Sequence, residues 1–171
     1  RASAICKFCD TDFVGVDGPG GGQFDSPDAV ADRVAQTWPS EDRATAYVVC
    51  TGGEPLLQLD APLIAAFQAR GFEVGVETNG TIAAPAGLDW ICVSPKAGAS
   101  LVQTSGDELK LVFPQEGADP AAFEHLGFAH FLLQPMDSPE RMRNTSAAVA
   151  YCKANPKWRL SLQTHKLLGL P

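Results

Sequence analysis

The sequence predicts an α/β fold built on a parallel sheet. Short apolar runs alternate along the chain with helical or loop segments, which is the pattern of parallel strands joined by crossover connections. Polar and glycine-rich segments follow these runs, at the edge of a parallel sheet where ligands bind. The chain has 171 residues and no stretch with the composition of a linker, so we expect a single domain over residues 1–171.

A helix is expected to begin at Ser26. This residue supplies a capping hydroxyl, Pro27 suits the first helical turn, and Asp28 places a negative charge near the positive end of the helix. An apolar stripe with four-residue spacing is expected to face the core: Val30, Val34 and Trp38. Pro39 is expected to end the helix.

Six short apolar runs predict the strands. They cover residues 46–50, 72–76, 90–93, 109–113, 131–133 and 158–162. The first run is almost wholly apolar, as expected for a strand that is covered on both faces. Further helices are expected over residues 60–70, 119–127 and 138–154, and Gly71 is expected to end the first of them. Residues 81–88 are too short and too rich in proline and glycine for a good helix.

Composition and charge narrow the class of protein. The net charge of −7 argues against a protein that binds nucleic acid through the phosphate backbone, because such binding needs a basic surface. No apolar run approaches the roughly 20 residues of a membrane-spanning helix. The five cysteines lack the spacing of a secreted disulfide framework, which indicates a reducing, cytoplasmic location.

The segment from Cys6 to Phe13 contains a pair of cysteines, Cys6 and Cys9, with two residues between them. Such a pair is compatible with half of a zinc site, a redox-active dithiol or part of an iron–sulfur ligand set. The other three cysteines fall in predicted strands or helices and are expected to pack as small apolar side chains: Cys50, Cys92 and Cys152.

Five motifs stand at or after predicted strand ends. In chain order they are Thr51-Gly52-Gly53-Glu54-Pro55, Glu77-Thr78-Asn79-Gly80, Ser94-Pro95-Lys96, Gln134-Pro135-Met136-Asp137 and Gln163-Thr164-His165-Lys166. A cysteine pair followed by Gly-Gly-Glu-Pro after the next strand resembles the radical S-adenosylmethionine (SAM) enzymes. The five motifs in this order resemble one family of that superfamily, the 7-carboxy-7-deazaguanine synthases of queuosine (deazapurine) biosynthesis. The resemblance runs from Cys6 to Pro171.

The resemblance implies an incomplete TIM-like barrel and a 4Fe–4S cluster that three cysteines hold. Cys6 and Cys9 match two of these ligands, and thiolates are suitable soft ligands for iron. The common CxxxCxxC spacing would place the third cysteine at position 2, where Ala2 stands. We therefore expect the third ligand upstream of Arg1, in an N-terminal segment that this chain lacks.

The resemblance also implies the residues that bind SAM. They come from the cysteine loop and from the strand ends: Phe8, Cys9, Asp10, Gly53, Glu54, Ser94, Pro95, Lys96, Gln134, Pro135, Met136 and Asp137. Glu54 would accept a hydrogen bond from a ligand ammonium group or a ribose hydroxyl, Ser94 would contact the ribose of SAM, and Lys96 its carboxylate. Apart from the resemblance, Gly-Gly is a tight turn and Lys96 is a solvated surface lysine.

Magnesium and a pterin substrate complete the implied site. The hydroxyl of Thr11 would bind Mg²⁺, for which a neutral oxygen is a legitimate ligand, although a turn hydroxyl is the simpler interpretation. The residues expected to contact the pterin are Thr51, Glu77, His165 and Pro171. A carboxylate such as that of Glu77 can accept two hydrogen bonds from the amino-pyrimidinone edge. A lone histidine or acid at such a position is otherwise a surface residue.

The reaction that the resemblance implies is a radical ring contraction. The cluster would reduce SAM, and the resulting 5′-deoxyadenosyl radical would take a hydrogen atom from 6-carboxy-5,6,7,8-tetrahydropterin, which then rearranges to 7-carboxy-7-deazaguanine and ammonia. We assign no side chain as a catalytic acid or base. A reducing partner such as flavodoxin and a homodimer are expected from the family. The alternatives are another radical SAM enzyme, such as a glycyl-radical activating enzyme, and a zinc-binding structural module.

Overall fold

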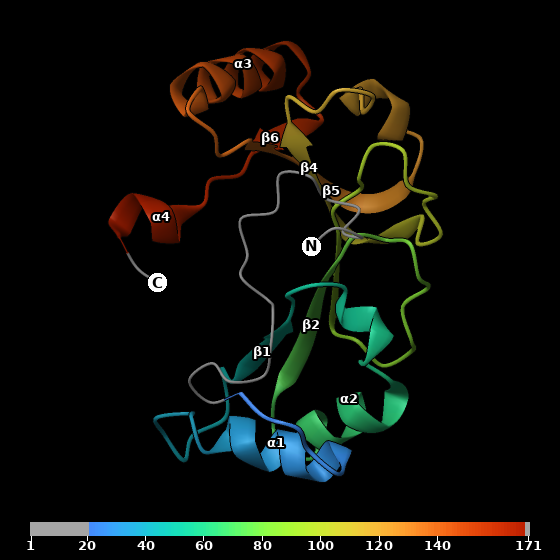
Figure 1. The fold of residues 1–171 in the computed structure, drawn as a ribbon, viewed down its shortest axis with the longest axis vertical. Helices are drawn as coiled ribbons and strands as arrows, with labels where there is room; N and C mark the ends of the chain where they lie inside the picture. Colours follow the sequence, from blue (N-terminus) through green and yellow to red (C-terminus); the bar gives the residue numbers. More distant parts are fainter. Residues whose placement is uncertain (1–20, 170–171) are drawn as a thin grey trace. The chain divides into compact units, whose positions relative to one another are not determined.

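The chain forms six strands of one parallel sheet with helices between them (Figure 1). The computed structural model describes residues 21–169. Its elements are α1 (Pro27–Ala35), β1 (Tyr47–Cys50), η1 (Pro55–Leu57), α2 (Ala61–Gln68), β2 (Glu73–Thr78), β3 (Trp90–Val93), β4 (Ser105–Phe113), η2 (Pro120–Phe123), β5 (Gly127–Pro135), α3 (Arg141–Ala154), β6 (Trp158–Leu160) and α4 (Thr164–Leu168). The strands follow the order β1-β2-β3-β4-β5-β6, so within these residues β1 and β6 are the edges of an open sheet.

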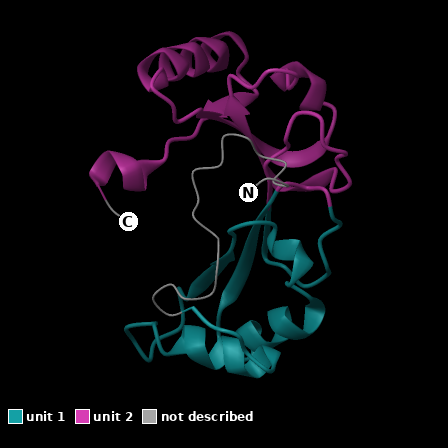
Figure 2. Ribbon diagram, viewed as in Figure 1, with its two compact units in different colours: residues 1–78, 82–91 teal, residues 79–81, 92–171 magenta. Residues whose placement is uncertain are grey.

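The described residues divide into two compact units, shown in different colours in Figure 2. The first unit contains the chain up to Thr78 together with Ile82–Ile91. The second contains Asn79–Thr81 and the chain from Cys92 onward. In each unit the strands pair in parallel: β1 pairs with β2 in the first, and β5 pairs with both β4 and β6 in the second. The polar segments therefore follow the carboxyl ends of neighbouring strands within each unit.

Helices α1 and α2 pack together in the first unit and form its core with the strands (Figure 1). Val48 and Cys50 of β1 pack against this core. The prediction that β1 is covered on both faces is wrong, because Tyr47 and Val49 on the opposite face are 39% and 47% exposed. An edge strand with helices on one side only leaves its alternate side chains in solvent.

The predicted helix starts in the first half of the chain are confirmed by hydrogen bonds, but the predicted end of the first helix at Pro39 is wrong, because α1 ends at Ala35. The Ser26 hydroxyl accepts from the backbone N–H of Ala29 at 3.1 Å and thereby caps α1. Asp60 caps α2 in the same way, accepting from the backbone N–H of Leu63 at 3.0 Å. Gly71 follows α2 with φ of +81°, a conformation that favours glycine and ends the helix.

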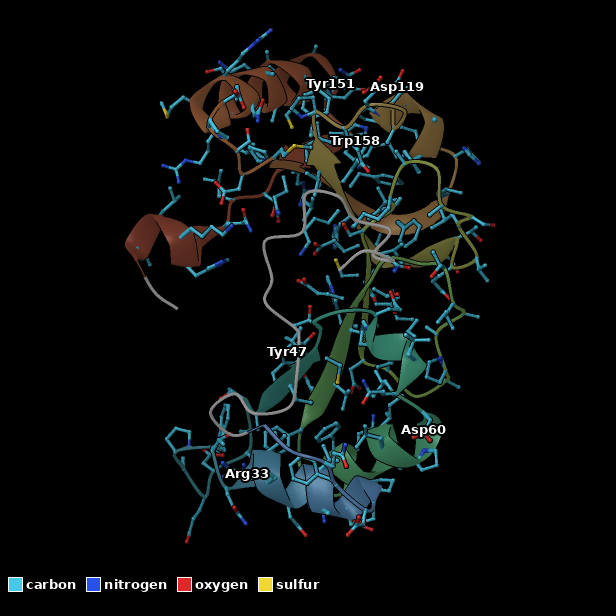
Figure 3. All side chains as sticks on the ribbon, viewed as in Figure 1. Arg33, Tyr47, Asp60, Asp119, Tyr151 and Trp158 are labelled. Atoms are coloured by element: carbon cyan, nitrogen blue, oxygen red, sulfur yellow. The ribbon has the colours of Figure 1, made fainter. Side chains whose placement is uncertain are left out.

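Aromatic packing dominates the core of the second unit, in which α3 lies against β5 and β6. Trp158 of β6 is 2% exposed, and its ring lies 5.4 Å from that of Phe131 and 6.4 Å from that of Tyr151. Its indole Nε1 donates to the Glu124 carboxylate at 2.8 Å, which satisfies the buried N–H group (Figure 3). These contacts join the last strand to α3 and β5.

Two predicted boundaries before β5 are wrong. Strand β4 begins at Ser105, before the apolar run, because its first residues pair with β5 from Gly127 onward. The helix predicted over residues 119–127 is only the short 3₁₀ helix η2, which Asp119 caps by accepting from Ala121 N–H at 3.0 Å. Residues 124–126 form a turn after η2, and β5 begins at Gly127.

The chain after β5 also differs from the prediction. Gln134 and Pro135, which were expected in the loop that follows the strand, are the last residues of β5. Strand β6 ends at Leu160, so the expected strand end at Leu162 is wrong. Residues 164–168 form the short helix α4, which ends at Gly169 with φ of +66°. Local signals for so short a helix are weak, and its glycine cap is the clearest of them.

Candidate active site

The sequence places the candidate site at the carboxyl ends of the strands, and the structure describes most of these segments. Six of the predicted site residues lie outside the described part of the chain: Cys6, Phe8, Cys9, Asp10, Thr11 and Pro171. The others fall in two sets. The first unit contributes the ends of β1 and β2, and the second contributes the ends of β3 and β5 together with α4.

The Gly-Gly-Glu segment follows β1 directly. Thr51 and Gly53 are exposed, as expected for residues that contact a ligand. Gly52 has φ of +116°, and a Cβ added to it would meet no atom within 4 Å. Glycine is therefore required here by its backbone conformation, and the open space beside it leaves room for a ligand to approach the main chain.

Glu54 is fixed by two hydrogen bonds to one of its carboxylate oxygens. Its Oε1 accepts from the backbone N–H of Leu56 at 3.0 Å and from the hydroxyl of Thr78 at 2.7 Å. Thr78 is the last residue of β2 and is 2% exposed. The structure thus brings the Gly-Gly-Glu-Pro and Glu-Thr-Asn-Gly motifs together. No role for Thr78 was predicted from the sequence. Its position inside the Glu-Thr-Asn-Gly motif was the feature that could have indicated one.

The sequence predicted that Glu77 follows the strand, but Glu77 lies within β2. Its side chain is exposed, whereas the neighbouring Val76 and Thr78 are buried. This alternation follows from the period of two in a strand and directs Glu77 away from the core of its unit. The Glu77 side chain therefore lies outside the packed core of its unit.

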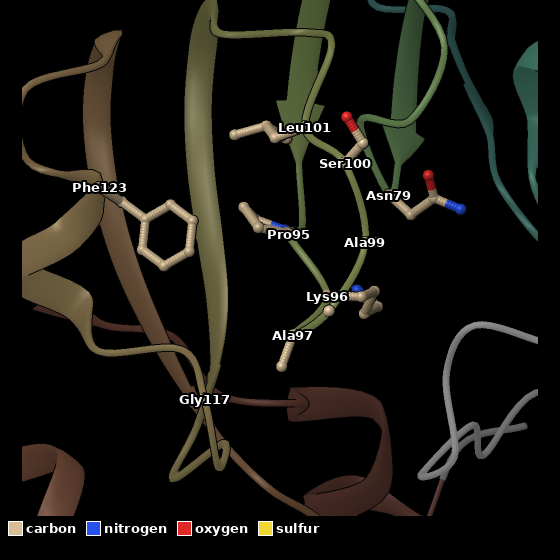
Figure 4. A pocket seen from close by; sticks show the side chains of 10 residues that line it. Asn79, Pro95, Lys96, Ala97, Ala99, Ser100, Leu101, Gly117 and Phe123 are labelled. Carbon is tan, nitrogen blue, oxygen red and sulfur yellow. The ribbon is translucent and has the colours of Figure 1, made fainter.

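Ser94 and Lys96 contact each other after β3. The Lys96 ammonium group donates to the Ser94 hydroxyl and to the Ser94 carbonyl, each at 2.6 Å. Lys96 and Pro95 line a small pocket of about 130 Å³ together with Asn79 and Phe123 (Figure 4). Pockets for whole drug-sized ligands are larger, about 300–1,000 Å³, so this one accommodates part of a ligand at most.

The end of β5 is joined to α4 by an ion pair. The Lys166 ammonium group lies 2.6 Å from an Asp137 carboxylate oxygen, and the two side chains are 26% and 33% exposed. The motifs at residues 134–137 and 163–166 are therefore adjacent, as expected for two parts of one site. His165 is exposed on α4. No role for Lys166 was predicted from the sequence, although Lys166 is the last residue of the Gln-Thr-His-Lys motif.

The prediction that the other three cysteines are packing residues agrees with their surroundings. All three are free thiols, and Cys92 is 2% exposed. Burial raises the pKa of the Cys50 thiol to about 11 and also raises the pKa of Cys152. Raised pKa values disfavour the thiolate that a metal needs. Within residues 21–169, no group of three or more histidine, cysteine or acidic side chains is arranged to hold a metal ion.

We expect Cys50 in the native protein to react slowly with iodoacetamide. A thiol pKa of about 11 in place of 9.0 lowers the thiolate fraction at pH 8 by about 100-fold, and the alkylation rate falls with it. Mass spectrometry of the labelled peptides measures the rate at each cysteine. In urea the rate at Cys50 should rise to that of an unfolded thiol. Equal rates in the native and unfolded protein would show that Cys50 is not buried as described.

Comparison with known proteins decides the family. The model of the radical SAM superfamily matches residues 3–107. The 7-carboxy-7-deazaguanine synthase of Caulobacter vibrioides is 63% identical across the whole chain and that of Bordetella pertussis 60%, and the match covers 81% of each relative. The chain belongs to the 7-carboxy-7-deazaguanine synthase family. The resemblance that the ordered motifs indicated is therefore confirmed.

A solved structure is also similar to this chain. The crystal structure of QueE from Escherichia coli matches with a TM-score of 0.56 and 26% identity, over 78% of this chain and 61% of that one. The α/β class and the open parallel sheet expected of an incomplete barrel are thus confirmed. Among the described residues, no helix is both long and apolar enough to cross a membrane.

The radical SAM family implies a 4Fe–4S cluster and SAM. Of these two, the described residues have groups suited to SAM. Glu54 supplies a carboxylate for an ammonium group, and Lys96 supplies an ammonium group for a carboxylate. The open backbone at Gly52 suits a ligand that lies against the main chain. The first unit therefore supplies a group suited to the ammonium of SAM, and the second supplies a group suited to its carboxylate.

Proposed function

We propose that this protein converts 6-carboxy-5,6,7,8-tetrahydropterin to 7-carboxy-7-deazaguanine and ammonia, as a carbon–nitrogen lyase of queuosine (deazapurine) biosynthesis. The observation that carries the proposal is the match to synthases of this name along the whole chain. The product and ammonia together contain the same atoms as the substrate, so the reaction consumes no net oxidant.

When bound, the reduced cluster and SAM supply the radical that starts the ring contraction. We propose Cys6 and Cys9 as two of the cluster ligands. The protein's own part is to hold SAM through the segments whose geometry is described: Gly53 and Glu54 in the first unit, and Ser94 to Lys96 and Gln134 to Asp137 in the second. Phe8 and Asp10 are proposed to complete these contacts.

The pterin is proposed to bind through Thr51, Glu77, His165 and the carboxylate of Pro171. The exposed position of Glu77 near the end of β2 supports this role. The ion pair of Asp137 with Lys166 holds α4, and thus His165, beside the end of β5. Thr11 is proposed to bind Mg²⁺, which would orient the substrate carboxylate.

The proposed setting is a reducing compartment, the cytoplasm. The three described cysteines are free thiols, which supports this location. A small flavodoxin-like protein is proposed as the electron donor, and a homodimer as the assembly. Both are properties that the family resemblance implies.

Turnover of the pterin tests the function. The full-length protein, reconstituted with iron and sulfide without oxygen, should form 7-carboxy-7-deazaguanine and an equal amount of ammonia when SAM and a strong reductant are present. Liquid chromatography with mass spectrometry detects the product, and omission of SAM is the control. Cleavage of SAM without any change in the pterin would favour the other radical SAM activities, including activation of a glycyl-radical partner.

Replacing Glu77 with glutamine is expected to raise the KM for the pterin by about 10- to 100-fold. The substitution removes a charged acceptor from a hydrogen-bonded pair, and charge-assisted bonds contribute about 1.5–3 kcal/mol. The Kd for SAM and its reductive cleavage should stay unchanged.

Glu73→Gln is the matched control for this change. Glu73 is also exposed on β2 and points to the same side as Glu77, but it stands at the opposite end of the strand. It should leave the KM for the pterin as in the wild type. If Glu77→Gln abolished pterin binding and SAM cleavage together, its role would be structural.

A further inference from the structure

The buried polar side chains of the described residues share one property. There are three of them in residues 21–169, and their exposed fractions are 2% for Thr78, 9% for Gln115 and 7% for Asn144. A buried polar group is costly unless it is hydrogen-bonded, so the partners of each group explain why it is there. In each case at least one partner lies in, or directly beside, a segment proposed to bind SAM.

Thr78 acts on the Gly-Gly-Glu-Pro segment of the first unit. Its hydroxyl donates to Oε1 of Glu54 at 2.7 Å, across a separation of 24 residues in the chain. The same oxygen accepts from the backbone N–H of Leu56 at 3.0 Å. Two donors from different directions restrict the rotation of the carboxylate, so Glu54 is held in one orientation before a ligand arrives.

Gln115 acts on the segment after β3, in the second unit. Its Oε1 accepts from the backbone N–H of Ala97 at 2.8 Å, and its Nε2 donates to the carbonyl oxygens of Pro95 and Val112, each at 3.4 Å. The main chain on both sides of Lys96 is therefore bonded to one amide group. That group is itself tied to the end of β4, so the position of Lys96 depends on Gln115.

Asn144 acts on the segment at the end of β5. Its Nδ2 donates to the carbonyl oxygen of Met136 at 3.0 Å and to the hydroxyl of Ser138 at 3.2 Å. These partners stand on either side of Asp137. Because Asn144 lies in the first turns of α3, the helix holds this segment through a side chain that is itself fixed by packing.

From this arrangement we infer that Thr78, Gln115 and Asn144 are positioning residues that pre-organise three SAM-binding segments, each by a buried hydrogen bond to that segment. The inference rests on the proposed function, because it takes these segments to be the ones that bind SAM. None of the three touches the ligand in this account. Their removal should weaken SAM binding through the residues that they hold: Glu54, Lys96 and Asp137.

The test removes each polar group and keeps the shape of the side chain. Thr78→Val, Gln115→Met and Asn144→Leu are suitable changes, and SAM binding to the reconstituted full-length protein is measured by anaerobic calorimetry together with the Tm of each variant. Each change should raise the Kd for SAM by 10-fold or more. Val74→Ala is the matched control, because Val74 is fully buried in the same strand as Thr78 and belongs to none of the segments proposed to bind SAM. It should lower the Tm and leave the Kd within twofold of the wild type.

Rescue separates positioning from packing. Thr78→Ser restores the hydroxyl but not the methyl group, and it should recover the wild-type Kd that Thr78→Val loses. This pair alone decides the inference if another variant does not fold. The inference is overturned if Thr78→Val binds SAM as the wild type does, or if the Kd follows the Tm equally in all variants, Val74→Ala included. Failure of the wild type to bind SAM would instead overturn the proposed function.

Discussion

Replacing Cys9 with alanine is expected to reduce product formation to less than about a thousandth of the wild-type rate, because the radical chemistry is the cofactor's and not the protein's. A cluster held by one thiolate fewer should not assemble, so iron and sulfide should also fall to background. Metal analysis and the visible absorption of the reconstituted protein measure this loss directly.

Cys152→Ala is the matched control for Cys9→Ala. Cys152 is a free thiol on α3 whose pKa is raised by burial, and no motif contains it. Its replacement should leave both the iron content and the rate of product formation unchanged. If Cys9→Ala retained a full cluster while Cys152→Ala lost it, the assignment of the cluster ligands would be wrong.

Trp158→Ala is expected to lower the free energy of unfolding by about 3–5 kcal/mol, the range for a large aromatic side chain in a core. The indole is 2% exposed and packs against the rings of Phe131 and Tyr151. Its removal leaves a cavity between α3, β5 and β6 and deprives Glu124 of a hydrogen bond. Urea unfolding followed by circular dichroism measures the change.

Trp158→Phe separates the two contributions. Phenylalanine keeps most of the ring contact and loses only the 2.8 Å bond from Nε1 to Glu124, so the expected loss is about 1–2 kcal/mol. A loss below about 1 kcal/mol for Trp158→Ala would mean that this aromatic cluster is not the core of the second unit.

The sequence correctly predicted those helix and strand boundaries that depend on only a few neighbouring residues. Strand β3 has the bounds that its apolar run indicated, and α1 begins where Ser26 caps it. The C-terminal end of α2 follows from Gly71. In each case the deciding interaction lies within a few residues of chain, so the sequence alone contains the information.

Tertiary context explains what the sequence did not predict. Val49 is exposed because its strand is an edge strand with helices on one side, and the edge position is a property of the whole sheet. Strands β4 and β5 are longer than their apolar runs because each supplies the other with hydrogen-bond partners. No local pattern encodes either fact.

In the candidate site, too, local motifs were predicted from the sequence, whereas residues that depend on tertiary context were not. Glu54 and Lys96 were predicted because they belong to motifs that could be recognised. Gln115 and Asn144 were missed because their importance comes from burial and from partners up to 20 residues away. A polar residue in a sequence carries no mark that it will be buried, so residues of this kind are found only from the structure.

The function proposed for this protein requires that Cys6 and Cys9 help to hold an iron–sulfur cluster that reduces SAM. Electron paramagnetic resonance of the reduced full-length protein, prepared without oxygen, tests this requirement. We predict the signal of a reduced 4Fe–4S cluster, and a change in that signal when SAM is added. A protein that takes up zinc but neither iron nor sulfide, and gives no signal under strong reductant, would contradict the account.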